Sequence, residues 1–322
     1  MEKAYFCTAE ELVRRGKDDL PKQFQSGEHL IYSSPATLAF NSPGAEGFGV
    51  KRAGLAVPGS IMLIVAPGCC GRNTSMISSM KEYNNRFFYL CMDETDIVTG
   101  RHLKKIPKAV ASICESLEKK PSVVMICITC VDALLGTDME RVCRKAEEKA
   151  GLPVRPCYMY ALTREGRKPP MVHVRQSLYS LLEPGRKKGN VVNLLGYFSP
   201  LVDDCELYTL LQEAGVKTIR EISRCEDFEE YKKMSEANFN LVLHPEARFA
   251  AEDFHDRLKI PFIELRRLYQ IDKIESQYQA FGAAIGAEFH AEDQKKQAQE
   301  AIESFRKVCP NSVFAIGECA NA

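Results

Sequence analysis

Apolar residues in this chain form short continuous runs, separated by longer stretches in which apolar positions recur every three or four residues. The continuous runs predict strands buried on both faces, and the periodic stretches predict amphipathic helices. In the first half, the predicted strands are Ile61–Ala66, Phe87–Met92, Val123–Thr129 and Val154–Tyr160, with helices including Ile106–Lys119 and Asp138–Ala150. This alternation is typical of a parallel α/β sheet.

The same alternation returns in the second half with shorter spacing. A basic stretch with Pro and Gly, Glu183–Gly189, separates the two halves. The predicted strands are Val191–Tyr197, Thr218–Ile222, Leu241–Leu243 and Phe262–Glu264, and the predicted helices are Asp203–Ala214, Asp227–Ala237, Ala250–Leu258, Asp272–Ile285 and Ala291–Val308. The fold class is therefore predicted as α/β, with consecutive Rossmann-like doubly wound parallel-sheet domains.

Three segments follow from this pattern. Residues 1–187 are predicted to form a first α/β domain, and residues 188–275 a small Rossmann-like α/β domain. Residues 276–322 are expected to hold the helices and first strand of an incomplete, truncated third domain, because the strand-like run Ser312–Cys319 has no partner strand after it. Alternatively, this last run adds to the edge of an existing sheet.

Composition and charge exclude several classes of protein. Lys+Arg and Asp+Glu both number 43, so the chain lacks the cationic excess that nucleic-acid binding requires. There is no long apolar run for a membrane span and no apolar signal segment near the start, so we expect a cytoplasmic protein. In that reducing compartment, the 13 cysteines are more often metal ligands, reactive thiols or buried apolar residues than disulfides.

Five cysteines gather where three predicted strands end. They are Cys69, Cys70, Cys91, Cys127 and Cys130. The carboxyl ends of parallel strands meet at one edge of a sheet, and thiolates are the ligands of iron–sulfur clusters. The alternative is that each cysteine merely packs, and this fits Cys127 best because it lies inside an apolar strand. The remaining cysteines are interpreted as packing or surface residues: Cys7, Cys114, Cys143, Cys157, Cys205, Cys225, Cys309 and Cys319.

Around these cysteines the sequence resembles the nitrogenase component 1 family. Ala66–Gly71 is similar to the family segment in which a proline precedes a Gly-Cys cluster ligand. Asp93–Gly100 and Thr129–Asp138 resemble its "E-x-D-I-V-x-G" and "T-C-x-x-x-x-I-G-D-D" segments. Val192–Gly196 and Lys259–Glu264 resemble its "V-N-I-I-G" and "G-I-P" strands, in the same order along the chain.

The resemblance implies a ligand set for an iron–sulfur cluster of the 4Fe–4S type or larger. Cys70 matches the family's second ligand, with Cys69 as the alternative, and Cys130 matches the third. The first ligand is expected near Phe40–Gly44, where this chain has no cysteine. Cys91, at a neighbouring strand end, is the expected replacement; Asn41 and Ser42 are poorer candidates.

The resemblance also implies a function. We expect an iron–sulfur redox subunit, a homodimer or pseudo-symmetric heterodimer, that accepts electrons from an ATP-dependent iron protein. The alternative is a scaffold or carrier for metallocluster assembly without substrate turnover. No iron–molybdenum cofactor is expected, because Pro245 in Leu243-His-Pro245 replaces the family's anchoring cysteine.

Further residues are candidates for roles around the cluster. Glu94, Asp96 and His244 are the candidate proton donors of a reductase. The segment Ser42–Gly59 is expected to cover the cluster, with Lys51 and Arg52 at the surface. A nucleotide-binding protein and a structural zinc site are weaker alternatives, since Gly68–Ser75 lacks the P-loop lysine and the cysteines are not paired as zinc knuckles.

Overall fold

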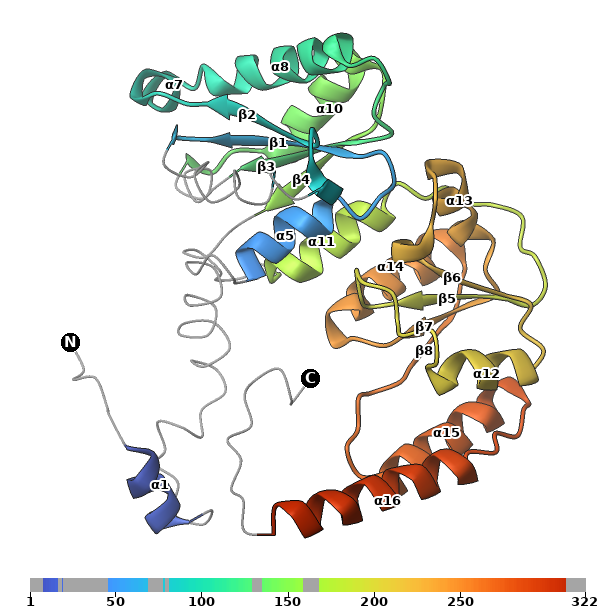
Figure 1. Cartoon of the computed structure of the whole chain (residues 1–322). Helices are drawn as coiled ribbons and strands as arrows, with labels where there is room; N and C mark the ends of the chain where they lie inside the picture. The colour runs from blue at the N-terminus through green and yellow to red at the C-terminus, as the bar shows by residue number, and fades with distance from the viewer. Residues whose placement is uncertain are drawn as a thin grey trace.

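The computed structural model describes residues 8–16, 19, 46–68, 78, 81–128, 135–158 and 168–310. Within this part of the chain, two four-stranded sheets form, and every strand pair in both is parallel (Figure 1). A short helix, α1 (Ala9–Arg15), lies at the start of the described chain. The predicted α/β class with two parallel sheets is confirmed.

The first sheet has the strand order β2-β1-β3-β4. Its strands are β1 (Ile61–Ala66), β2 (Phe87–Cys91), β3 (Val124–Ile128) and β4 (Val154–Tyr158). The chain starts at β1, adds β2 on one side, and then crosses to the other side for β3 and β4. This crossing makes the sheet doubly wound, as predicted.

Helices cover both faces of the first sheet. On one face, α8 (His102–Ser116) and α10 (Met139–Ala150) pack Ile106 and Val142 against Leu63 and Val65 of β1. On the other face lie α5 (Glu46–Gly54) and α11 (Pro170–Tyr179), which the apolar pattern did not predict. Every residue of β1 is buried, which explains why its apolar run is continuous.

The second sheet has the order β6-β5-β7-β8. Its strands are β5 (Val191–Leu195), β6 (Thr218–Glu221), β7 (Phe239–Val242) and β8 (Phe262–Glu264). Helices α12 (Glu206–Glu213) and α15 (Ile271–Ile285) contribute to the core on one face. Helices α13 (Phe228–Lys232) and α14 (Arg248–Leu258) contribute to the core on the other. The predicted helix Asp227–Ala237 is in fact α13 followed by a 3-10 turn, η3 (Lys233–Glu236).

Helix α11 joins the two sheets into one continuous core. Its Val174 and Leu178 belong to a buried cluster that also contains Phe254 of α14. The Tyr231 hydroxyl donates to the Leu178 carbonyl at 2.6 Å, and the Gln176 amide donates to Asp253 at 2.9 Å. These contacts of α11 therefore largely fix the position of one sheet relative to the other.

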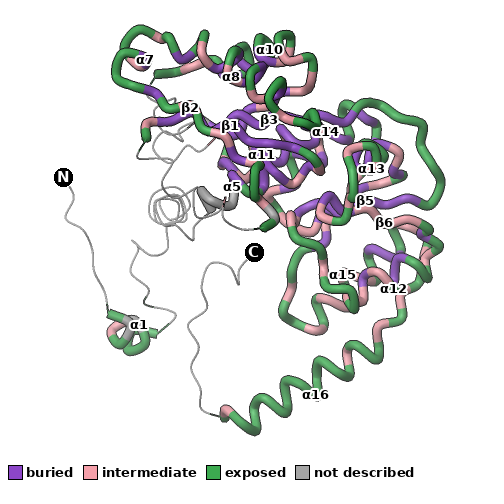
Figure 2. The backbone as a smooth tube through the Cα atoms, turned by 45° about the horizontal axis from the view of Figure 1, so that its top comes forward, coloured by how far each residue is buried: buried purple, intermediate pink, exposed green. Residues whose placement is uncertain are grey.

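The last described helix, α16 (Glu292–Val308), contains no buried residue, and Figure 2 shows it as largely exposed. Its Lys295 forms an ion pair with Glu275 of α15 at 2.7 Å. The predicted strand Ser312–Cys319 lies outside the described residues. No described helix is both long and apolar enough to cross a bilayer.

Candidate functional site

The carboxyl edge of the first sheet is the place where the cysteine hypothesis can be tested. Ala66, at the end of β1, is paired in register with Cys91, at the end of β2. Val65 is paired on the other side with Ile128, at the end of β3. The three strands therefore end together, as the sequence predicted, and the structure places β1 between the other two.

Cys91 is the one predicted cluster ligand that lies among the described residues. It is exposed and is a free thiol. By strand alternation it shares a face with Phe87 and Tyr89, and Phe87 packs in the core beneath α5. Cys91 thus presents an accessible sulfur at the strand end where a ligand was predicted.

Cys69, Cys70 and Cys130 lie outside the described residues, so the predicted convergence of four thiols stays a prediction. Asn41 and Ser42 lie outside them as well. Across the described ranges, no three His, Cys, Asp or Glu side chains group in a way that could hold a metal ion. The described residues alone therefore supply one thiol at this edge rather than a complete ligand set.

Cys127 is a packing residue, as its apolar surroundings predicted. It is fully buried and paired in register with the buried Cys157 of β4. The hydrogen bond with Cys127, together with burial, raises the pKa of the Cys157 thiol well above its ordinary value. The Cys157 thiol also donates to the Val50 carbonyl at 3.5 Å. Cys127 and Cys157 therefore pack in the core beneath α5.

The expectation that Lys51 lies at the surface is wrong. Lys51 is 2% exposed, and its charge lies close to the Cys127 and Cys157 thiols. The pKa of Cys127 is lowered mainly by its hydrogen bond with Cys157 and also by the Lys51 charge, which offsets only part of the rise at Cys157. The difference arises because 46–54 is a helix whose face packs on the sheet, rather than an irregular cover. Arg52, the next residue, is exposed as expected.

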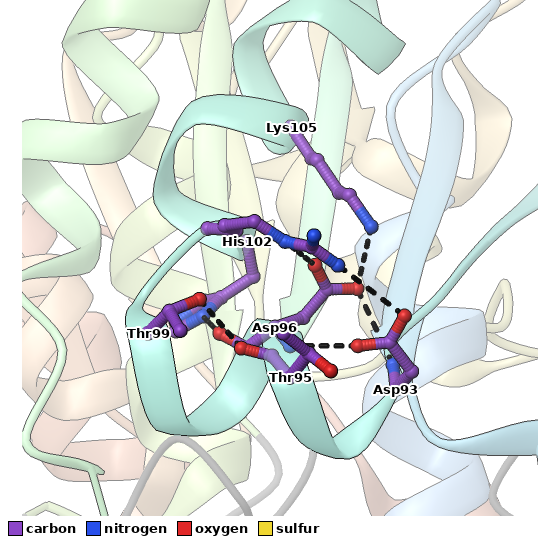
Figure 3. A network of polar contacts seen from close by, with 7 residues as sticks. Asp93, Thr95, Asp96, Thr99, His102 and Lys105 are labelled. Carbon is purple, nitrogen blue, oxygen red and sulfur yellow. Dashed lines mark hydrogen bonds and ion pairs between the residues drawn. The ribbon is translucent and has the colours of Figure 1, made fainter.

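The acidic segment after β2 is a helix start. Asp93 caps α7 (Glu94–Thr99), and the Asp93 and Asp96 side chains each accept from the other's backbone N–H (Figure 3). The Asp96 side chain is fully buried and accepts from Lys105 at 2.6 Å and Arg101 at 3.0 Å. The hydrogen bond from Lys105, supported by those from Asp93 and Arg101, lowers the pKa of Asp96 to about 2.

These contacts assign Asp96 a structural role. A carboxyl group with this pKa is ionised at neutral pH, so Asp96 is not a proton donor there. Glu94 lies in the first turn of α7 and is exposed. The E-x-D-I-V-x-G segment therefore fixes the connection from β2 to α8.

Replacing Asp96 with asparagine is expected to lower the melting temperature at pH 7 by roughly 5 °C, because Lys105 and Arg101 lose their ionised partner. The folded-state pKa of Asp96 is depressed, so its stabilisation is present above about pH 4 and is lost as pH falls toward 2. Thermal unfolding followed by circular dichroism between pH 2 and 7 measures both effects. Asp138→Asn, at the cap of α10, is the control, since asparagine still caps a helix. Equal losses in the two variants would contradict this role.

A second candidate region is a cleft between the two sheets, with a volume of about 710 Å³. Tyr197 and Phe198, which follow β5, and His244, which follows β7, lie on its wall. The chain crosses from one side of β5 to the other between β6 and β7, so β5 and β7 flank the switch point of this sheet. Ligands of open α/β sheets commonly bind at such a point.

Arg175 of α11 is the central polar residue of this cleft. Its side chain is 5% exposed, and it donates to the Gly196 carbonyl at 2.6 Å and to Glu246 at 2.8 Å. Its guanidinium also lies over the Phe198 ring, 4.7 Å from the centroid. Arg175 therefore links the helix that packs on the first sheet to the switch point of the second.

His244 lies beside this pair in its neutral form. Burial lowers the pKa of its imidazole, and the charges of Arg175 and Arg267 lower it further, against the raising effect of Glu246. Its Nδ1 accepts from the Glu246 backbone N–H at 3.3 Å, which leaves the proton on Nε2. A neutral imidazole is a weaker proton donor than an imidazolium, and the donor role considered for His244 stays a prediction.

Gly196 lets β5 and β7 approach closely at this point. Its φ is +146°, and a Cβ there would lie 2.8 Å from the His244 backbone nitrogen. Gly196→Ala is therefore expected to lower the free energy of unfolding by about 3 kcal/mol. Urea denaturation measures the change, with Gly189→Ala as control, where a Cβ would meet no neighbour within 4 Å. A Gly196→Ala protein as stable as the control would contradict the steric argument.

Sequence reasoning missed Arg175 because it missed α11. Pro170 at the start of that helix, with Val174 and Leu178 four and eight residues later, was the available signal. Arg86, which also lines the cleft, carries no local pattern that marks it. Its guanidinium donates to the carbonyl groups of Leu55 and Ser60, in the turn before β1.

Comparison with known proteins agrees with the motifs. A model of the nitrogenase component 1 type oxidoreductases matches residues 46–317. The chain belongs to this family. The match confirms the predicted resemblance and places both the carboxyl edge and the cleft inside the segment that the family shares.

Similar family members carry names that refer to cofactor assembly. The chain is 26% identical over 247 residues to the nitrogenase iron-molybdenum cofactor biosynthesis protein NifE of Nostoc sp., covering 74% of this chain and 51% of that protein. It is 31% identical over 162 residues to NifE of Rhizobium meliloti, covering 48% of this chain and 34% of that protein. The chain thus spans about half the length, or less, of these relatives.

The fold of the family is visible in solved structures. The structure titled "Nitrogenase Cp1 at pH 6.5" matches with a TM-score of 0.59 and 18% identity, covering 78% of this chain and 59% of that one. At this identity the match concerns the fold alone. It supports the nitrogenase component 1 type architecture for this member of the family.

Proposed function

We propose that this chain is a scaffold or carrier that holds an iron–sulfur metallocluster as cargo during the assembly of a metal cofactor. Two findings support the proposal. The chain belongs to the nitrogenase component 1 type family, and the relatives described above are named for iron-molybdenum cofactor biosynthesis. These names fit the scaffold alternative better than the redox subunit that the motifs first indicated.

The exposed thiol of Cys91 at the end of β2 is the observation that carries the proposal. Cys69 and Cys70 directly follow Gly68, two residues after β1, and Cys130 follows β3 by two residues. Because β2 and β3 both pair in parallel with β1, the carboxyl ends of all three strands lie at the same edge of the sheet. Soft thiolate ligands from such an edge suit an iron–sulfur cluster.

The chemistry of the candidate proton donors favours holding a cluster over converting a substrate. Asp96 is held ionised by Lys105, and His244 is held neutral. Neither is in the form that donates protons most readily at neutral pH. Pro245, where the family resemblance expects an anchoring cysteine, offers no ligand atom, and a carrier must be able to release its cargo.

The redox-subunit hypothesis has one specific point in its favour, the oxidoreductase name of the family. In that version the chain forms a dimer and receives single electrons from an ATP-dependent iron protein. The two functions differ in what happens to the metal. A carrier passes its cluster to an acceptor, whereas a redox subunit keeps its cluster and passes electrons.

Cluster transfer distinguishes them. The protein is reconstituted anaerobically with iron and sulfide, desalted, and mixed with an apo-ferredoxin as acceptor, without ATP or an iron protein. We expect iron to leave the chain and the absorbance of the acceptor's cluster to appear. Iron that stays on the chain, with reduction only when an iron protein and ATP are added, would support the redox subunit instead.

A further inference from the structure

The edges of the two sheets differ in how well they are protected against pairing with another strand. The strand orders β2-β1-β3-β4 and β6-β5-β7-β8 leave β2, β4, β6 and β8 as the edge strands. An edge strand turns main-chain N–H and C=O groups outward, and these groups can pair with a strand of another molecule. Natural sheets therefore block their edges with charged side chains, proline or very short strands.

Three of these edges carry such protection. On the open side of β4, the Val154 N–H donates to the Glu147 carboxylate at 3.3 Å, and the Val154 carbonyl accepts from Arg155 Nη1 at 2.9 Å. The next residue that faces outward is Pro156, which has no N–H. In the second sheet, β6 carries two charged residues among its four, and β8 is only three residues long.

The β2 edge has none of these devices. Its five residues, Phe87–Cys91, include no charged residue and no proline. The Met62 N–H donates to the Arg86 carbonyl at 2.8 Å, and the Met92 N–H donates to the Ala66 carbonyl at 3.0 Å, so the even-numbered residues of this strand face β1. Alternation along the strand turns the main-chain groups of residues 87, 89 and 91 to the open side. Within the described ranges, no other segment forms a main-chain hydrogen bond with these groups.

The open side of β2 is complementary to itself. Its three outward-facing residues are centred on Tyr89, so a two-fold axis at this residue places Tyr89 opposite Tyr89 of a second copy. Phe87 then lies opposite Cys91 of the copy. In antiparallel strands, opposite residues that both face the partner exchange two hydrogen bonds, so every outward N–H and C=O of β2 is paired.

The residues on either side of β2 also suit this register. Asn84 and Asn85, before one β2, come opposite Glu94 and Asp93, after the other, and all four are exposed. Amide donors thus meet carboxylate acceptors, and no like charges face each other. The Tyr89 side chain is 42% exposed and adds apolar area beside the main-chain contact.

We propose that β2 is a dimer interface, at which it pairs antiparallel with β2 of a second copy and joins the two first sheets edge to edge. A two-fold contact uses the same surface on both copies, so it closes as a dimer and does not propagate. The symmetry of the outward-facing residues about Tyr89 favours a second copy over a strand of another protein. The contact uses main-chain groups and does not require the proposed cluster function.

Sedimentation equilibrium with the full chain tests the proposal. We expect the wild type to form a dimer that dissociates on dilution. Tyr89→Lys places two like charges opposite each other and is expected to raise the Kd of the dimer by about tenfold. Tyr89→Glu is expected to do the same. Val202→Lys, at an apolar residue after β5 that is 69% exposed, is the control and should dimerise like the wild type.

An equimolar mixture of Tyr89→Lys and Tyr89→Glu tests the register. Opposite charges then face each other across the two-fold axis, so the mixture is expected to dimerise more tightly than either variant alone. Circular dichroism checks that both variants are folded, and two different substitutions keep the test open if one of them does not fold.

Three results would overturn the proposal. They are a wild type that stays monomeric at its highest soluble concentration, a Tyr89→Lys protein that dimerises like Val202→Lys, and a mixture that dimerises no better than its components. Cys91→Ala is expected to dimerise like the wild type, because its main-chain groups are unchanged. This variant separates the dimer surface from the proposed cluster.

Discussion

Replacing Arg175 with methionine is expected to lower the free energy of unfolding by about 3 to 5 kcal/mol. Methionine keeps much of the side-chain volume but removes the guanidinium that pairs with Glu246 at 2.8 Å and binds the Gly196 carbonyl at 2.6 Å. Both partners would then lose this donor, and an unpaired carboxylate that is 27% exposed, like that of Glu246, is destabilising. Urea denaturation followed by circular dichroism measures the loss.

Arg248→Met is the matched control for this prediction. Arg248 also pairs with carboxylates, Glu252 and Glu264, but its side chain is 56% exposed. A surface pair contributes about 0 to 1 kcal/mol, so the control should be nearly as stable as the wild type. Adding Glu246→Gln to Arg175→Met should recover part of the loss, because it removes the unpaired charge. If Arg175→Met matches Arg248→Met in stability, α11 does not join the sheets through this arginine.

Replacing Cys91 with alanine is expected to remove most of the iron that the anaerobically reconstituted protein retains after desalting. Replacing a residue that only hydrogen-bonds to a metal ligand typically weakens metal binding about tenfold or more, so loss of a direct ligand at Cys91 should cost at least that much. Iron and acid-labile sulfide analysis measures the loss. The fold should be unaffected, since Cys91 is exposed at a strand end.

Cys309→Ala is the control for the Cys91 prediction. Cys309 is partly exposed and directly follows α16, a helix that lies away from the first sheet (Figure 1). Its loss should leave the iron content unchanged. Equal iron in the Cys91→Ala and Cys309→Ala proteins would show that Cys91 is not a ligand, and the scaffold proposal would then rest on family membership alone.

The strands were predictable because both faces of each sheet are covered. β1 and β8 have the predicted bounds, and β2, β5, β6 and β7 differ from theirs by one or two residues at their ends. In β7 the predicted run Leu241–Leu243 missed Phe239 and Asn240. Asn240 is fully buried and is hydrogen-bonded to Asn193 at 2.7 Å, so a polar residue at a core position obscured the apolar pattern.

The missed helices have a different cause. α5 carries glycines at positions 47, 49 and 54, which favour an irregular segment over a helix. A Cβ at Gly54 would lie 2.5 Å from the terminal methyl of Met62, so α5 and β1 lie close together at this glycine. Tertiary packing overrides the local preference, and it also buries Lys51, a residue that local sequence places at the surface.

The candidate site was predictable only where strand ends define it. Cys91 could be chosen because parallel strands end at a common edge. Arg86 and Arg175 could not, because each acts through backbone carbonyls or a carboxylate distant in sequence, such as Leu55 for Arg86. The domain division at residue 187 stays a prediction, as α11 packs within the core shared by both sheets.

X-ray absorption at the iron edge of the reconstituted protein tests the central claim most directly. The account predicts iron surrounded by sulfur in the wild type and loss of this iron when Cys70, Cys91 and Cys130 are replaced together by alanine. A matched triple variant, with alanine at Cys205, Cys225 and Cys309, should retain the wild-type spectrum. Iron bound to sulfur that survives in the first variant as it does in the second would contradict a cluster held at the carboxyl edge of the first sheet.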